Sequence, residues 1–99
     1  MDIKLTAASE SKDIAIVEFD MAGEKVNKFN SAMLYRLREI VGELKKSSYK
    51  CVIFKSNKPK IFIAGADIDE IKSLNTREQF AKGVEIGQSI FCELEDLPM

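Results

Sequence analysis

The stretch Ile61–Glu70, with the sequence IFIAGADIDE, is the first indication of how the chain folds. Its apolar start leads to Gly65, and the alanines on both sides of this glycine allow another group to approach the backbone closely. A helix is predicted to begin at Asp67, and its first N–H groups would be unpaired and carry a partial positive charge. Alone, the pattern is typical of a glycine turn that faces an anion.

The composition narrows the possible functions. The chain has 99 residues, of which 45% are hydrophobic and 31% charged, and its net charge is −1. This favours one globular domain over a general binder of nucleic acid or anionic membranes, and no apolar run suggests a membrane span or signal peptide. The absence of histidine excludes Ser-His and Cys-His nucleophiles and histidine-based metal sites. We expect Cys51 and Cys92 to be buried free thiols.

Hydrophobic periodicity predicts an α/β fold. Alternating segments at Ile3–Ala7 and Ile14–Phe19 predict two strands that pair antiparallel, followed by a loop over Asp20–Asn30. The continuous apolar run within Lys50–Lys55 predicts a strand that is buried on both faces. Because a helix precedes this strand, we expect a crossover connection.

Two longer helices are predicted. The first is capped by Asn30 or Ser31 and ends near Lys46, with a stripe of apolar residues at helical spacing: Met33, Leu37, Ile40, Val41 and Leu44. The second begins at Thr76 with a capping box to Gln79 and stops at Pro98. Its predicted buried face comprises Phe80, Val84, Gly87, Phe91 and Leu94, and Gly83 and Gly87 suggest a closely packed neighbour.

Two groups of charged residues leave alternatives open. Asp67, Asp69 and Glu70 could bind magnesium, but we favour the interpretation that they offset a helix dipole. A set of lysines flanks the glycine turn in sequence and would suit a phosphorylated ligand if the loops meet; scattered, solvated lysines are the equal alternative. This set comprises Lys25, Lys28, Lys58 and Lys60.

Two motifs carry a resemblance to a known family. The segments FIAGADI at residues 62–68 and EKVNKFN at residues 24–30 resemble the crotonase (enoyl-CoA hydratase/isomerase) superfamily. The chain is most similar to the N-terminal hydratase part of multifunctional fatty-acid β-oxidation enzymes, from about Ile14 to Pro98. The resemblance implies the N-terminal part of a crotonase-like ββα superhelix, with a mixed sheet flanked by helices.

The resemblance also implies roles for individual residues. The backbone N–H of Ala66 would be one of two oxyanion-hole donors to the thioester carbonyl. Binding of coenzyme A would involve Lys25, Val26, Ala64, Gly65, Asp67, Ile68 and Asp69. The coenzyme A thioester is the substrate, and neither a prosthetic group nor a metal is implied.

The catalytic glutamates of the family would follow Pro98, so we assign none of them within residues 1–99. We therefore expect a partial enoyl-CoA hydratase domain that ends before the second half of the active site and is inactive alone. The full reaction would hydrate a 2-enoyl-CoA to a 3-hydroxyacyl-CoA in fatty-acid β-oxidation. The alternatives are a Δ3-Δ2 enoyl-CoA isomerase and a non-catalytic module for coenzyme A binding or assembly.

The resemblance further implies self-association, as a homotrimer, a hexamer or part of a multifunctional complex. We expect no nucleic-acid partner and no membrane span. The expected location is the bacterial cytoplasm, or the mitochondrial matrix or peroxisome in a eukaryote.

Overall fold

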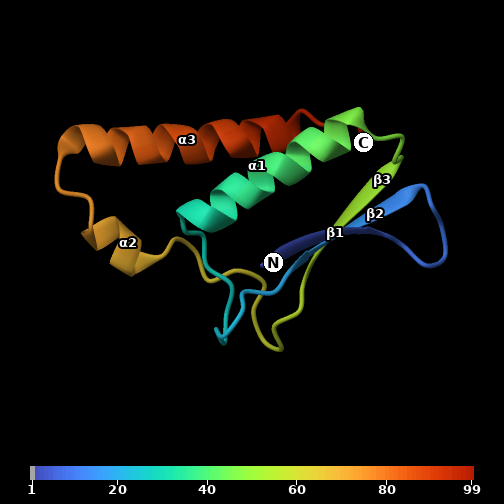
Figure 1. Ribbon diagram of the computed structural model, residues 1–99, viewed down its shortest axis with the longest axis horizontal. Coiled ribbons are helices and arrows are strands. Elements are labelled where there is room, and N and C mark those ends of the chain that lie inside the picture. The colour runs from blue at the N-terminus through green and yellow to red at the C-terminus, as the bar shows by residue number, and fades with distance from the viewer. Residues whose placement is uncertain (1) are drawn as a thin grey trace.

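The structure is a computed structural model that describes residues 2–99. Within these residues it contains three strands and three helices: β1 (Ile3–Ala7), β2 (Ile14–Phe19), α1 (Ser31–Lys46), β3 (Cys51–Ser56), α2 (Ile68–Lys72) and α3 (Arg77–Glu95). None of the helices in this described part is long and apolar enough to cross a membrane. Figure 1 shows the sheet on one side of the molecule and the two long helices, α1 and α3, on the other.

The three strands form one mixed sheet in the order β1-β2-β3. β1 pairs antiparallel with β2, with Ile3 opposite Phe19, and β2 pairs parallel with β3, with Ile16 opposite Ile53. α1 is the crossover between the two parallel strands. The predicted antiparallel pair, the crossover and the mixed α/β architecture are therefore confirmed.

The stripe predicted for α1 forms the centre of the core. The Oδ1 atom of Asn30 accepts a hydrogen bond of 2.8 Å from the N–H of Met33 and so caps the helix. All five stripe residues are at most 1% exposed, and they pack in one cluster with the inward side chains of β2. Burying each such side chain stabilises the fold by about 1.5–3 kcal/mol. The helix is thus fixed firmly to the sheet.

The predicted buried face of α3 is only partly correct: Leu94 is partly buried against the core, whereas Val84 is 47% exposed. Ile90 is fully buried and packs with α1, supported by the partly buried Ile86 and Leu94. Phe80 and Phe91, from the predicted face, are 49% and 42% exposed. Apolar residues cover two adjacent sides of this helix, and periodicity does not tell which side meets α1. The expected close neighbour at the two α3 glycines is also wrong, because the structure has open space around both.

β3 is covered on one face, whereas the sequence predicted burial on both. Its residues alternate between exposed and half-buried, and Ile53 on the open face is 46% exposed. Both long helices lie on one side of the sheet, so within the described chain only the face of β3 toward the helices is covered. The expectation of buried thiols is wrong for the same reason: Cys51 lies on the open face of β3, and Cys92 is exposed on α3.

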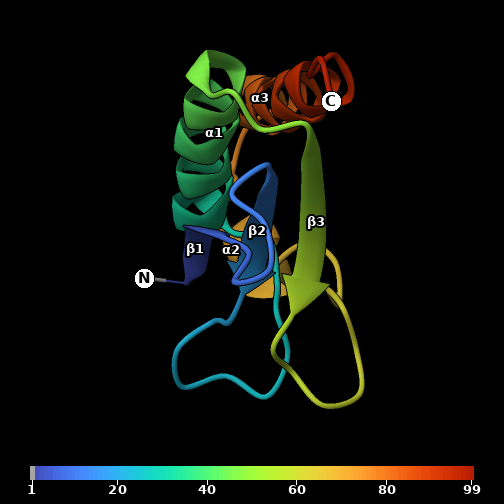
Figure 2. The same ribbon diagram turned by 90° about the vertical axis from the view of Figure 1, so that its right-hand side faces the viewer.

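The parallel arrangement brings two long loops together. The loops that follow β2 and β3 lie side by side beyond the ends of these strands in both views (Figures 1 and 2). The N–H of Asn57, just after β3, donates a hydrogen bond of 2.9 Å to the carbonyl oxygen of Phe19, the last residue of β2. The carboxyl ends of the two parallel strands therefore position the loops that form the glycine turn and its surroundings.

Candidate functional site

The glycine turn is paired with the loop after β2 by a short parallel bridge between Phe29 and Ala66. The N–H of Phe29 donates to the carbonyl oxygen of Gly65 at 2.7 Å, and the N–H of Asp67 donates to the carbonyl oxygen of Phe29 at 2.8 Å. One step earlier, the N–H of Ala64 donates to the carbonyl oxygen of Asn27 at 2.7 Å. In a parallel pair the bonded residue reaches the two neighbours of its partner, so the N–H of Ala66 points away from the Phe29 loop.

This pairing leaves the N–H of Ala66 unused. Of the four N–H groups from residue 64 to residue 67, those of Ala64 and Asp67 are paired within the described chain, whereas those of Gly65 and Ala66 donate to no protein acceptor. Gly65 has a φ of +121°, a conformation that other residues rarely adopt. The glycine therefore provides a backbone turn in which the next N–H faces outward, beside a side chain of a single methyl group.

Ala66 lies on the wall of an open apolar cavity of about 480 Å³. Residues of α1, α2 and α3 also line this cavity. Its lining includes Leu34, Tyr35, Ile71, Leu74, Phe80, Val84 and Phe91. The only carboxylates that line it are those of Asp67 and Glu70, at the same end as Ala66. An apolar cavity with a few polar groups at one end suits a ligand with an apolar chain and one polar group.

The side chains of the three acids of the turn differ in their surroundings. Asp67 caps α2, because its Oδ1 accepts hydrogen bonds from the N–H groups of Asp69 at 3.0 Å and Glu70 at 3.4 Å. Glu70 instead reaches α1, where its carboxylate accepts hydrogen bonds from Ser31. Asp69 is exposed in the first turn of α2. In residues 2–99 no group of three or more acidic or thiol side chains is arranged to hold a metal ion.

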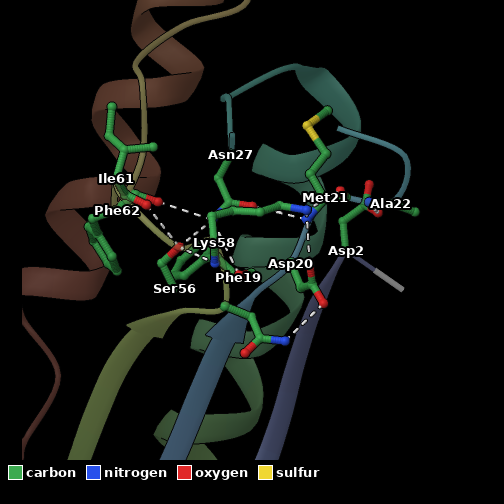
Figure 3. A network of polar contacts seen from close by, with 11 residues as sticks. Asp2, Phe19, Asp20, Met21, Ala22, Asn27, Ser56, Lys58, Ile61 and Phe62 are labelled. Atoms are coloured by element: carbon green, nitrogen blue, oxygen red, sulfur yellow. Dashed lines mark hydrogen bonds and ion pairs between the residues drawn. The ribbon is translucent and has the colours of Figure 1, made fainter. Parts of the chain in front are cut away.

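A fully buried amide, that of Asn27, fixes the loops around the turn (Figure 3). Its Oδ1 accepts a hydrogen bond of 2.9 Å from the N–H of Met21. Its Nδ2 lies within hydrogen-bond distance of the carbonyl oxygens of Phe19 at 3.2 Å and Phe62 at 3.0 Å, and of the Ser56 hydroxyl at 2.9 Å. One side chain therefore joins the ends of β2 and β3 to the start of the glycine turn.

The lysines predicted to surround the turn do not act as one group. Lys25 and Val26 line a second cavity of about 590 Å³ together with Lys58 and Lys60. The two predicted loops therefore do meet. However, these residues line a different cavity from Ala66. Lys28 does not line the second cavity, but its Nζ lies 3.9 Å from the carboxylate of Glu24, which does.

Lys58 contacts other residues of the chain and is not free to meet a ligand. Its side chain is only 10% exposed, and its Nζ lies 2.9 Å from Asp20 and donates to the carbonyl oxygen of Met21 at 2.7 Å (Figure 3). Hydrogen bonds from Lys58 and then from Asn57 lower the pKa of Asp20 below its usual value of 3.8. Within residues 2–99, Lys25 and Lys60 make no ion pair and are exposed, so they are the cations of this cavity that remain available to a ligand.

The chain is similar to known proteins in part of its sequence and in its fold. No known protein-family profile matches the sequence. The chain is 34% identical over 90 residues to the fatty acid oxidation complex subunit alpha of Vibrio parahaemolyticus; this match covers 90% of the chain and 13% of that protein. The enoyl-CoA hydratase of Bacillus anthracis superimposes with a TM-score of 0.86 at 23% identity, over 100% of this chain and 37% of that one.

This chain has the crotonase fold. It matches the N-terminal part of crotonase-fold enoyl-CoA hydratases, as the sequence motifs predicted. An enoyl-CoA hydratase/carnithine racemase from Magnetospirillum magneticum gives the same TM-score of 0.86 at 24% identity, over 100% of this chain and 36% of its own length. The chain thus spans little more than a third of the crotonase-fold structures that it matches.

Two residues important to the geometry of this crotonase-fold turn had no assigned role in the sequence analysis. Asn27 was only part of a motif, and Glu70 was interpreted as an acid that offsets the dipole of its own helix. A polar residue in a loop has no periodic pattern that reveals burial. The partners of Asn27 are up to 35 residues away in sequence and that of Glu70 is 39 residues away, so local spacing contained no signal for either.

Proposed function

We propose that this chain forms the thioester-binding part of an enoyl-CoA hydratase of fatty-acid oxidation. The observation that carries the proposal is the unpaired N–H of Ala66 on the wall of the apolar cavity. A preformed donor stabilises the negative charge that develops on a thioester oxygen when water adds to the conjugated double bond. The loss of one such donor typically costs about 2.7–4 kcal/mol of transition-state stabilisation.

The surroundings of Ala66 support the same assignment. The cavity beside it is apolar and suits an acyl chain. The second cavity, with the exposed ammonium groups of Lys25 and Lys60, suits the phosphates of coenzyme A. We assign the backbone of Ala64, Gly65 and Ile68 to the path between these two ends of the ligand. Asp67 and Asp69 would act through α2, which Asp67 caps.

A binding experiment tests this proposal on the 99-residue chain. We expect acetoacetyl-CoA to slow amide hydrogen exchange at Ala66, because the thioester oxygen would accept its hydrogen bond. The amides of Ala64 and Asp67 are the internal controls, since each is already paired at 2.7 or 2.8 Å. Acetoacetyl-CoA binding that leaves the Ala66 amide unchanged would contradict the proposal.

A second experiment concerns turnover. We propose that the residues that move protons during hydration are not among residues 2–99, and therefore that this chain binds crotonyl-CoA without converting it. The loss of the enone absorbance of crotonyl-CoA measures hydration directly. Conversion by the 99-residue chain alone would show that its own side chains supply the acid and the base.

A further inference from the structure

The helix that follows the glycine turn has little to hold it in place. α2 has five residues and buries none of them; Ile68 and Ile71 are 65% and 41% exposed. A helix of this length is not stable by itself, because its few hydrogen bonds do not offset the cost of nucleation. Its position must therefore come from specific contacts at its ends.

Glu70 makes the contact that reaches another element. The N–H of Ser31, the first residue of α1, donates to both carboxylate oxygens, at 2.9 Å to Oε1 and 3.0 Å to Oε2, and the Ser31 hydroxyl donates to Oε1 as well. α1 has no acidic residue in its own first turn. Glu70 therefore supplies, from a different helix, the negative charge that the positive end of α1 favours.

The arrangement fixes the turn on both sides of the proposed donor. The carbonyl oxygen of Gly65, in the same peptide unit as the Ala66 N–H, accepts a hydrogen bond from Phe29, and the N–H of Asp67 donates to the carbonyl oxygen of Phe29. After Ala66, Asp67 caps α2, and Glu70 joins α2 to α1, which is packed firmly on the sheet. The chain from Ala66 to Glu70 thus runs between two anchored points.

Glu70 lines the same cavity as Ala66, which raises the question of whether it acts on the substrate itself. Both of its oxygens already accept hydrogen bonds from the backbone N–H of Ser31. A carboxylate that is occupied in this way is poorly placed to take a proton from water. Its contacts instead suit a positional task.

We propose that Glu70 is a positioning residue, which ties α2 to the start of α1 and thereby directs the N–H of Ala66 toward the thioester carbonyl. This inference rests on the proposed function, because it concerns the same donor. It predicts that removing the contact changes how the carbonyl is polarised, while the binding of coenzyme A without an acyl group is retained.

The test compares three variants with the original chain: Glu70→Ala, Glu70→Gln and the control Glu78→Gln. Glu70→Ala removes the contact, and Glu70→Gln keeps an acceptor for Ser31 but removes the charge. Glu78 is an exposed acid in the first turn of α3 and makes no hydrogen bond or ion pair within residues 2–99. The main readout is the carbonyl stretching frequency of bound crotonyl-CoA labelled with carbon-13 at the thioester carbon. A hydrogen bond from Ala66 lowers this frequency.

We expect Glu70→Ala to return the frequency toward that of free crotonyl-CoA and to weaken crotonyl-CoA binding by up to about tenfold, the effect of weakening the one hydrogen bond from Ala66 to the thioester. Glu70→Gln should fall between this variant and the original chain, and Glu78→Gln should match the original. The affinity for coenzyme A itself should change by less than about twofold, since its phosphates are assigned to the second cavity, which Glu70 does not line. An equal urea midpoint for all variants would show that the fold is intact.

The possible failures are distinguishable. If the original chain shows no lowered carbonyl frequency, the donor role of Ala66 is wrong and the proposed function fails. If the original chain shows it and Glu70→Ala shows it equally, the donor role stands and the positioning role of Glu70 is wrong. Equal weakening of coenzyme A and crotonyl-CoA binding would also refute a role specific to the thioester.

Discussion

Replacement of Asn27 with alanine is expected to lower the free energy of unfolding by about 2–4 kcal/mol. The main cause is the N–H of Met21, a residue that is only 8% exposed. This N–H donates to Asn27 Oδ1 at 2.9 Å and to no other acceptor within the described chain. A buried donor that loses its partner costs about 1–3 kcal/mol.

The other partners of Asn27 lose less. The carbonyl oxygen of Phe19 keeps the hydrogen bond from Asn57, and the Ser56 hydroxyl keeps its bond to Ile61. Phe62 is 48% exposed, so water can reach its carbonyl oxygen. The loss of these hydrogen bonds adds about 1 kcal/mol to the destabilisation, because each partner keeps another hydrogen bond or is reached by water.

Urea unfolding followed by circular dichroism measures the effect. The matched control is Asn57→Ala, which removes an exposed amide with one hydrogen bond of 3.1 Å to Asp20 and should cost less than about 0.5 kcal/mol. Asn27→Asp should destabilise more than Asn27→Ala, because a carboxylate oxygen would face the carbonyl oxygens of Phe19 and Phe62. A loss below about 1 kcal/mol for Asn27→Ala, or an equal loss for Asn57→Ala, would refute this reasoning.

Three further predictions follow from the packing and charges. Because the pKa of Asp20 in the folded state lies below 3.8, its contribution to stability is complete above that pH and is lost as the pH falls through the folded value. The stability advantage of the original chain over Asp20→Asn should therefore shrink as the pH falls from about pH 5 to about pH 2 in urea titrations, and a constant difference would contradict this. Ile90→Ala should lower the free energy of unfolding by about 2–5 kcal/mol, whereas Phe80→Ala, at an exposed site on the same helix, should lower it by less than about 1 kcal/mol in the same assay. Equal losses would mean that α3 is packed differently. Both cysteines should react with a thiol reagent in the native state at rates near that of the unfolded chain, since both are exposed, and protection of either would place it in an interface.

The predictions from the sequence were most accurate for elements that bury a single apolar face within this chain. All five stripe residues of α1 are buried, and Asn30 caps the helix as expected. The antiparallel and parallel pairings were also predictable, because a short connection allows the first and a helical crossover requires the second. In these cases local periodicity and tertiary packing favour the same arrangement.

Prediction from the sequence failed where the buried side of an element depends on contacts with residues that are distant in sequence. α3 has apolar residues on two sides, and only the packing of Ile90 against α1 identifies the inner one. β3 has an apolar run, but within the described chain no helix covers the outer face of the sheet, so Ile53 is exposed. For the site, the motif is the source of the proposal for Ala66, whereas the contacts of Asn27 and Glu70 are hydrogen bonds across the fold that no local pattern encodes.

Because Lys58 forms its contacts within the chain, these contacts and the exposed lysines of the same cavity should respond differently to ionic strength. The Lys58 side chain is only 10% exposed and that of Asp20 is 42% exposed, so added salt should screen their ion pair less than one between two exposed side chains. Lys25 and Lys60 are exposed, and their attraction for an anionic ligand is screened within about 10 Å at 0.1 M salt. A salt titration would therefore weaken the capture of a phosphorylated ligand while the loops beside the glycine turn keep their shape.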